Sequence, residues 1–177
     1  MGARSKARKR ALDVLYESEL RGTDPVATLA ERTAQADPPI GEYAAQIIHG
    51  VQAHRARIDE LIDSYAQGWN LDRMPAVDRN ILRIALFEML GSEEVPHAVA
   101  VDEAIELAAS LSTDDSPRFV NGMLSKILHD LPSLASAQSP LASTDTSGLD
   151  TPSAIAVEAG VQGAGLTDKD APSHEGA

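Results

Sequence analysis

The first ten residues carry the side chains best suited to binding phosphate. They include five basic residues and no acidic ones: Arg4, Lys6, Arg8, Lys9 and Arg10. Clustered positive charges of this kind contact the phosphates of a nucleic acid and release its counterions. The formal net charge of the whole chain is −12, so these residues form a basic arm on an acidic protein. Charge alone leaves a second interpretation open, in which the arm is a solvated terminus.

Two aromatic residues extend this candidate nucleic-acid site. Tyr16 follows the arm, and Phe119 stands between Arg118 and the nearby Asn121. Proteins hold single-stranded RNA through positive charge along its backbone, aromatic rings that stack on bases and amides that contact base edges. The pattern therefore predicts RNA contacts from these four side chains. For Phe119 taken alone, a place in the hydrophobic core is the simpler interpretation.

Residues arranged for catalysis are not found. The sequence has no cysteine, no GxSxG or HExxH motif and no glycine-rich phosphate loop. His49 and His54 are five residues apart, whereas ligands on one helix face are three or four apart. Asp114 and Asp115 precede an expected helix, where carboxylates commonly complement the helix dipole. We therefore predict a protein that is not an enzyme and holds no metal or cofactor.

The segment 75–90 predicts the helix around which the others pack. Its apolar residues recur at three- and four-residue spacing on two adjoining faces, which is typical of a helix surrounded by other helices. Its polar side chains are then expected on a narrow uncovered strip: Asp78, Arg79, Asn80, Arg83 and Glu88.

Similar patterns predict helices on either side of this segment. The first is expected to continue from the basic arm and to end at residue 21. The others are expected at 25–34, 41–67, 99–111 and 116–132, and Ser116 suits an N-cap. In the first helix, Arg4, Arg8 and Lys9 should point away from the buried face. No window alternates as a half-buried strand does. We predict an all-α fold, a compact bundle of six or seven helices.

The sequence predicts no membrane-spanning segment, and its amino-acid composition changes near residue 137. No run of about 18 uncharged apolar residues is present, and no apolar segment follows the basic arm as in a secretory signal. A cytoplasmic protein is therefore expected. Residues 137–177 are rich in Ser, Thr, Gly, Ala, Pro and Asp, which predicts a disordered acidic tail of low complexity.

Three segments resemble the family of the transcription antitermination factor NusB. They read ARKRALDVLYESEL, PAVDRNILRIALFEML and VDEAIELAASLSTDDSPRFVNGML, and the resemblance covers roughly residues 3 to 131. It implies an all-α domain of two helical subbundles over 3–136, with the arm of residues 1–10 leading into the first helix. It also implies binding to the boxA element of ribosomal RNA leader transcripts. NusE, a ribosomal protein, would bind alongside, in a complex that helps RNA polymerase read through terminators.

By position, the resemblance assigns roles to particular residues. The family's RNA-binding arm falls on the five basic residues already named, its first-helix aromatic on Tyr16 and its FVNG element on residues 119–122. Its acidic NusE contacts fall on Asp78 and Asp115. An acidic body would suit a basic ribosomal partner. The tail is not part of the family pattern, and the arm has fewer arginines than in some members.

Several alternatives stay open at this stage. The chain could be a helical protein–protein interaction module that does not bind RNA directly. It could also be the regulatory domain of an RNA cytosine methyltransferase, although no methyl-donor-binding α/β domain follows. The chain could be a monomer or a weak homodimer. If it binds RNA, the arm and the start of the last helix should lie side by side, so that one strand crosses both. Four or five phosphate contacts would give a salt slope of about −3 to −3.5.

Overall fold

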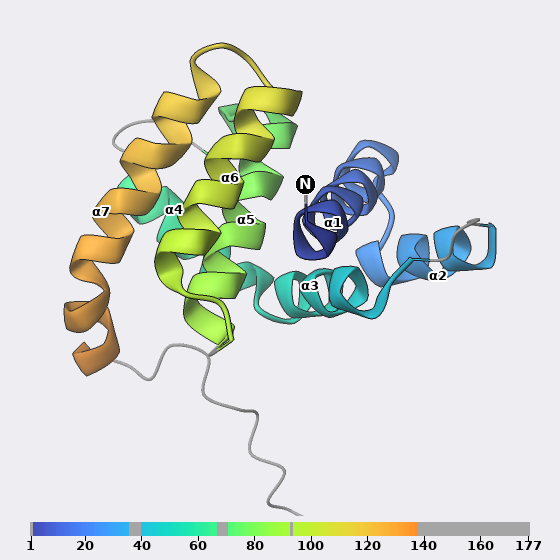
Figure 1. The fold of residues 1–177 in the computed structure, drawn as a ribbon, viewed down its shortest axis with the longest axis horizontal. Helices are drawn as coiled ribbons and strands as arrows, with labels where there is room; N and C mark the ends of the chain where they lie inside the picture. The colour runs from blue at the N-terminus through green and yellow to red at the C-terminus, as the bar shows by residue number, and fades with distance from the viewer. Residues whose placement is uncertain (1, 36–39, 67–70, 93, 138–177) are drawn as a thin grey trace, which may run out of the picture. The chain divides into compact units, whose positions relative to one another are not determined.

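The computed structural model describes residues 2–35, 40–66, 71–92 and 94–137, with side chains described as far as Pro132. The chain divides into two units, residues 1–143 and 144–177, and the second lies wholly outside the described residues, as does most of the predicted tail. Figure 1 shows an all-helical first unit, as predicted. No helix in the described ranges is long and apolar enough to cross a membrane.

The described residues form seven α-helices and one 3₁₀ turn. These are α1 (Ala3–Arg21), α2 (Pro25–Gln35), α3 (Glu42–Ala53), α4 (Arg55–Tyr65), η1 (Leu71–Arg73), α5 (Ala76–Gly91), α6 (His97–Leu111) and α7 (Ser116–Ala137). The segment 41–67, expected as one helix, is two helices that meet at His54, whose φ of −108° and ψ of 14° interrupt the regular α geometry. Local capping interactions set the end of α1 and the start of α2. Gly22 takes a left-handed φ of 63° after α1, and Asp24 accepts hydrogen bonds from the backbone N–H groups of residues 26 and 27.

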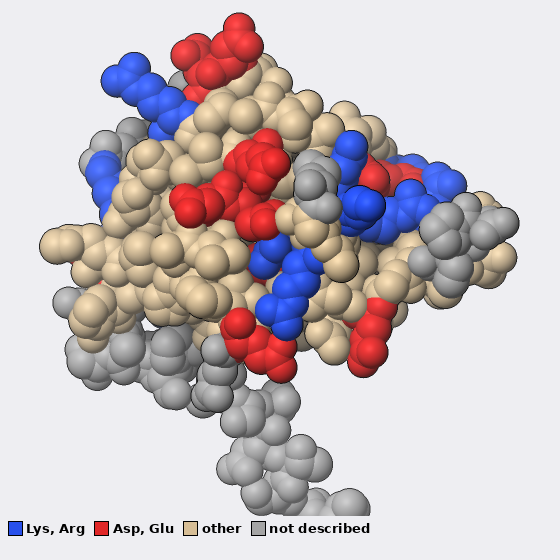
Figure 2. Space-filling model, in the orientation of Figure 1, with Lys and Arg blue, Asp and Glu red and all other residues tan. Residues whose placement is uncertain are grey.

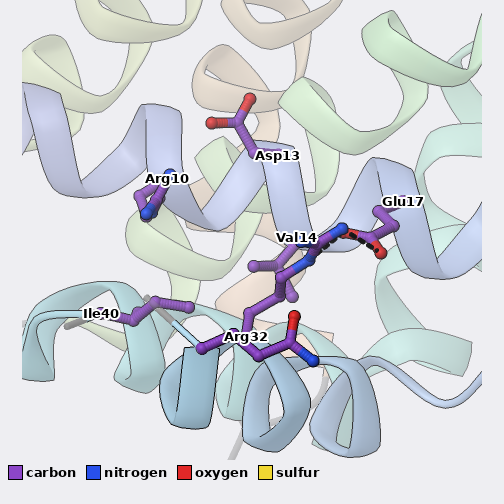
Figure 3. A pocket seen from close by; sticks show the side chains of 7 residues that line it. Arg10, Asp13, Val14, Glu17, Arg32 and Ile40 are labelled. Carbon is purple, nitrogen blue, oxygen red and sulfur yellow. Dashed lines mark hydrogen bonds and ion pairs between the residues drawn. The ribbon is translucent and has the colours of Figure 1, made fainter. Parts of the chain in front are cut away.

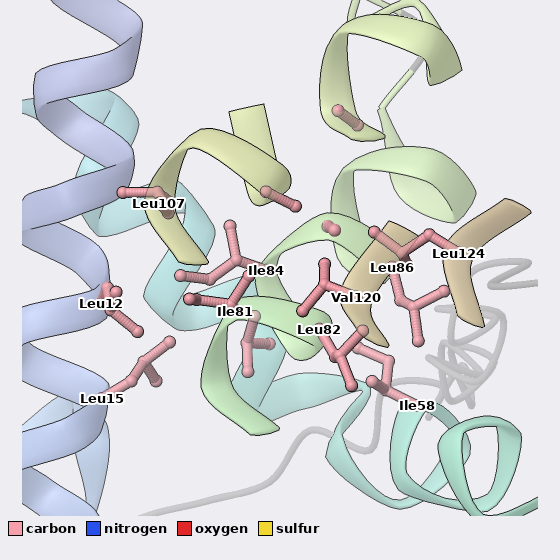
Figure 4. Close-up of a cluster of buried hydrophobic side chains, with 14 of the residues drawn as sticks. Leu12, Leu15, Ile58, Ile81, Leu82, Ile84, Leu86, Leu107, Val120 and Leu124 are labelled. Carbon is pink, nitrogen blue, oxygen red and sulfur yellow. The ribbon is translucent and has the colours of Figure 1, made fainter. Parts of the chain in front are cut away.

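Helix α5 lies at the centre of the fold, as its two apolar faces predicted. It packs against α1, α3, α4, α6 and α7. Ile81, Leu82 and Leu86 on α5 are fully buried. Figure 4 shows Leu12 of α1 on one side of this cluster and Leu124 of α7 on the other. Burying apolar side chains of this size stabilises the fold by about 1.5–3 kcal/mol each.

The helices form two groups, as the family resemblance implied. Helices α1, α2 and α3 pack against one another, and α4 to α7 form a second group that includes α5. Helices α3 and α5 approach closely at Gly50, where an added Cβ would lie 2.0 Å from a ring carbon of Phe87. A glycine is therefore required for this contact between the groups.

The predicted uncovered strip on α5 is wrong. Asp78, Asn80, Arg83 and Glu88 are all at most 3% exposed and Arg79 is half-buried, because neighbouring helices cover most of α5. These side chains bond instead to partners on other helices, as buried polar groups must. The Arg83 guanidinium, for example, donates to Asp59 of α4 at 2.7 Å.

Candidate binding surfaces

Arg8 is part of the core and does not point away from it, which corrects the sequence prediction. Its side chain is 2% exposed, and Nε donates to both carboxylate oxygens of Glu88 at 2.9 Å. Glu103 of α6 lies 3.4 Å away, and the hydroxyl of Tyr43 donates to Glu88 from α3. Burial and the bond to Glu88 together raise the pKa of Tyr43 to about 12, so this hydroxyl stays a donor well above neutral pH. The arm is therefore anchored through Arg8 to three other helices.

The other four basic residues of the arm are on the surface. Arg4 is paired with the exposed Glu94 at 2.9 Å and lies over the Tyr43 ring, 5.2 Å from its centroid. Lys6, Lys9 and Arg10 are exposed, and their side chains make no ion pair or hydrogen bond within the described part of the chain. These three side chains are available to an external phosphate.

Beside Arg10, α1 and α2 enclose a hollow of about 410 Å³ (Figure 3). Arg32 reaches across from α2 and pairs with Glu17 of α1 at 2.7 Å, and Asp13 lies near the rim. The charges in this hollow are mixed and one cation is already paired. It therefore does not enlarge the phosphate-binding surface of the arm.

Tyr16 lies on α1 beyond the arm and is half-buried. One turn further on, Leu20 is 66% exposed, the most exposed large apolar side chain among the described residues. Lys9, Asp13, Tyr16 and Leu20 follow at intervals of three or four residues, so they share one side of the helix. Leu20 was not predicted as a candidate, because an apolar residue near a helix end is normally assigned to the core.

At the start of α7, the two predicted partner contacts border one hollow of about 280 Å³. Asp115 is exposed, whereas Asp78 is 3% exposed. One Asp78 oxygen accepts a hydrogen bond from Ser116 Oγ at 2.8 Å, and the other, Oδ1, has no hydrogen-bond partner in the described structure. Ser116 is the first residue of the helix, and its hydroxyl thus ties α7 to α5.

Phe119 combines both interpretations offered by the sequence. Its ring is half-buried and packs on the core, yet it also lines the hollow at Asp78 and a second hollow of about 480 Å³. Arg118 and Asn121 beside it are exposed, and Asn121 accepts a hydrogen bond from Ser125 at 3.1 Å. All three predicted α7 residues therefore reach the surface, and Arg118 and Phe119 line the same hollow.

The arm and the start of α7 are not side by side, which corrects a second expectation. Arg8 binds α5 at Glu88, near the end of that helix, and Ser116 binds it at Asp78, near its beginning. Ten residues of helix separate these points by about 15 Å. Glu19, at the far end of α1, binds Arg79 and therefore brings that end of α1 toward the beginning of α5. Helix α1 thus runs antiparallel to α5 and leads from the arm toward the start of α7.

Charge is unevenly distributed over the face in Figure 2. Basic side chains gather over α1 and α2, and acidic side chains gather over α6 beside them. Among the described residues, no group of three or more His, Asp or Glu side chains is placed to hold a metal ion. A basic region and an acidic region therefore lie next to each other on this face of the described structure.

Comparison with known proteins gives one consistent result. The sequence model of the NusB family matches residues 5–129. A transcription antitermination protein NusB from a Nocardioides species is 57% identical over 135 residues, covering 76% of this chain and all of that protein. The NusB of Saccharopolyspora erythraea is 60% identical over 129 residues, covering 72% of this chain and 87% of that protein.

Two solved structures share the fold. NusB of T. maritima matches with a TM-score of 0.67 and 33% identity, over 73% of this chain and 92% of that one. A crystal structure of antitermination factors NusB and NusE in complex with double-stranded RNA matches with a TM-score of 0.64 and 27% identity. That match covers 71% of this chain and 96% of the other.

Proposed function

The chain belongs to the NusB family of transcription antitermination proteins, and from this premise we propose that it binds the boxA element of ribosomal RNA leader transcripts together with NusE. In this role it is a non-enzymatic adaptor that helps RNA polymerase read through terminators. It acts on nascent transcripts and therefore works in the cytoplasm. The relative crystallised with NusE and RNA supports both partners. The observation that carries the proposal is the set of three exposed cations on α1 that have no ion-pair partner among the described residues.

In this proposal the basic residues of the arm have different roles. Lys6, Lys9 and Arg10 supply the phosphate contacts, and Arg4 can join them by leaving Glu94, because an exposed ion pair is worth at most about 1 kcal/mol. Arg8 instead holds α1 in place. Three to four contacts give a salt slope of about −2 to −3, somewhat shallower than five contacts would give.

Bases stack on the two half-exposed rings, with Tyr16 nearer the arm and Phe119 at the start of α7. Arg118, which lines the same hollow as Phe119, contributes a phosphate contact, and Asn121 contributes base-edge contacts. Because the arm and Phe119 lie at opposite ends of α5, the strand has to follow α1 past Tyr16 to reach both.

NusE binds at the hollow between α5 and α7. Asp115 offers an exposed carboxylate, and Asp78 offers a buried oxygen that has no hydrogen-bond donor within the described residues. A buried acceptor without a donor costs about 1–3 kcal/mol, and a donor from a partner would remove that cost. A basic ribosomal protein carries many such donors, and the long-range attraction favours its association with an acidic surface.

The proposal is tested by measuring binding of a boxA-like single-stranded RNA at two salt concentrations, with and without NusE. We expect salt-sensitive binding that NusE strengthens, and weaker binding of a scrambled RNA. The triple variant Lys6→Ala, Lys9→Ala, Arg10→Ala should lose most of the RNA affinity while unfolding like the parent. Absence of RNA binding under all these conditions would leave only the protein-binding module.

NusE pairing is tested separately by calorimetry. Asp115→Arg should weaken NusE binding more than RNA binding, because it places a positive charge against a basic partner. The control is Asp102→Arg, an exposed position on α6 away from the hollow. An unchanged affinity of Asp115→Arg for NusE would remove this residue from the interface.

A further inference from the structure

Arg79 joins the end of α1 to the segment that leads into α5. Its guanidinium pairs with Glu19 of α1, and Nε donates to that carboxylate at 3.1 Å. The same guanidinium donates to the backbone carbonyl oxygens of Leu71 and Met74, the latter at 3.0 Å. Arg79 and Glu19 are both half-buried. One cation therefore bonds to two parts of the chain that are distant in the sequence.

The sequence explains why this segment is held by a side chain. Pro75 precedes α5 and has no backbone N–H to donate, and the helix begins without a capping hydrogen bond from a side chain. Within the segment, the backbone N–H of Met74 donates to the carbonyl oxygen of Leu71 at 3.2 Å, which closes a short 3₁₀ turn. The two carbonyl bonds from Arg79 fasten that turn to α5.

The segment held by Arg79 forms one wall of the hollow assigned to NusE. Met74 and Pro75 line this hollow from the segment before α5, and Asp115 and Phe119 line it at the start of α7. Arg79 is not one of the lining residues. Its effect on a bound partner would therefore be exerted through the position of the wall.

We propose that Arg79 is a positioning residue for NusE binding. It fixes the wall at Met74 beside the carboxylates of Asp78 and Asp115, and a wall fixed in advance does not have to be ordered when the partner binds. Glu19 holds Arg79 from α1, so the helix that carries the RNA-binding arm also supports the hollow. The inference rests on the proposed binding of NusE at this hollow and adds to it a residue outside the contact surface.

A variant that lacks the Arg79 guanidinium should still fold. Glu19 would lose one partner, but its other carboxylate oxygen accepts hydrogen bonds from Asn80 at 3.0 Å and from Arg83 at 2.9 Å. Arg79→Leu therefore leaves no buried charge uncompensated, which is the costly consequence of breaking an ion pair. What it removes is the attachment of the 3₁₀ turn to α5.

The test measures the affinity of Arg79→Leu for NusE by calorimetry and the NMR signals of isotope-labelled methionine methyl groups. The affinity should fall by about 2- to 30-fold, the range expected for a residue that acts on a site without touching the ligand. The methyl signal of Met74 should shift, whereas that of Met89, near the end of α5, should not. Binding of a short RNA that contacts only the arm should be unchanged. Arg79→Lys keeps the charge but not the planar fork, so it should recover only part of the lost affinity.

Two control variants accompany Arg79→Leu. Arg32→Leu breaks a different ion pair of α1, the one with Glu17, at a residue that does not line the NusE hollow. It should leave the affinity for NusE unchanged. Asp115→Arg alters the hollow itself and should weaken NusE binding whatever the role of Arg79.

The outcomes distinguish this inference from the proposed function. If Asp115→Arg weakens NusE binding but Arg79→Leu does not, or if the Met74 signal stays in place, the inference is wrong and the proposed function stands. If Arg32→Leu weakens NusE binding as much as Arg79→Leu does, the effect comes from a general loosening of α1, and the inference is also overturned. If NusE binds all three variants as it binds the parent, the hollow is not its site, and that part of the proposed function fails together with the inference.

Discussion

Replacing Arg8 with Met distinguishes an anchoring arginine from a phosphate-binding one. Methionine keeps an apolar stem of similar length but removes the charge that faces Glu88, where both side chains are 2% exposed. Removing one partner of a buried ion pair leaves the other charge uncompensated and costs about 3–5 kcal/mol. Lys9→Met, one residue further on at an exposed position, should change the free energy of unfolding by less than about 0.5 kcal/mol. Urea unfolding followed by circular dichroism measures both values.

A second variant distinguishes the cost of an unpaired buried charge from a general loss of folding. The double change Arg8→Met, Glu88→Leu removes both buried charges, and such replacements are often neutral or stabilising. It should therefore recover most of the stability lost in Arg8→Met. The half-buried hydroxyl of Tyr43 would lose its acceptor but can turn toward water, so this recovery should not be blocked.

The salt dependence of RNA binding should rank the two positions in the opposite order: position 9 should matter and position 8 should not. The double variant at Arg8 and Glu88 should keep the parent's salt slope, because Arg8 contacts no phosphate. Lys9→Met should flatten the slope by about 0.7. Fluorescence anisotropy of a labelled boxA-like RNA at several salt concentrations measures both slopes. The reasoning is refuted if Arg8→Met unfolds like the parent and flattens the salt slope as much as Lys9→Met does.

Three further predictions follow from other parts of the structure. Because the pKa of Tyr43 is raised to about 12 in the folded protein, its contribution to stability is complete below pH 10 and is lost as the pH rises toward 12. The difference in unfolding free energy between the parent and Tyr43→Phe should therefore shrink over that range, and a constant difference would contradict it. Gly50→Ala should destabilise the protein by about 1–3 kcal/mol in thermal unfolding because its Cβ meets Phe87, whereas Gly122→Ala, at an open helical position, should be neutral or slightly stabilising. Equal effects at the two glycines would argue against the close approach of α3 and α5. Phe119→Ala should weaken boxA binding by about 1–3 kcal/mol if a base stacks there, whereas a loss only in proportion to the unfolded fraction would make the residue core.

The sequence predicted which residues form helices and which helix is central, because apolar periodicity is a local signal. The apolar residues of α5 are buried as their spacing required, and Gly22 ends α1 as expected. The same signal could not show where the polar residues of α5 find partners. Arg83 bonds to Asp59, 24 residues away, and Arg8 bonds to Glu88, 80 residues away. Local periodicity therefore predicts that a charged residue on a central helix is exposed, because it cannot identify a partner that is distant in the sequence.

The exposure of individual candidate residues could be predicted from the sequence better than their arrangement in space. Lys9, Arg118 and Asn121 are exposed as RNA contacts must be, whereas Asp78 is reached only through a hollow. The family pattern assigns positions in the chain, and only the packing on α5 shows that the arm and the start of α7 attach to this helix at points about 15 Å apart. Spacing along the sequence holds no information about that separation.

The separation has a physical consequence for how this surface would bind a strand. Helix α1 is fastened to α5 at both ends, through Arg8 with Glu88 and through Glu19 with Arg79. A strand that reaches both the arm and Phe119 therefore meets two contact regions already fixed relative to each other, and it does not have to order the protein. An RNA too short to span that distance contacts only one region, so affinity should rise in a step as the strand is lengthened. Loosening either attachment of α1 should reduce this increase in affinity with RNA length while leaving the affinity for the short RNA unchanged.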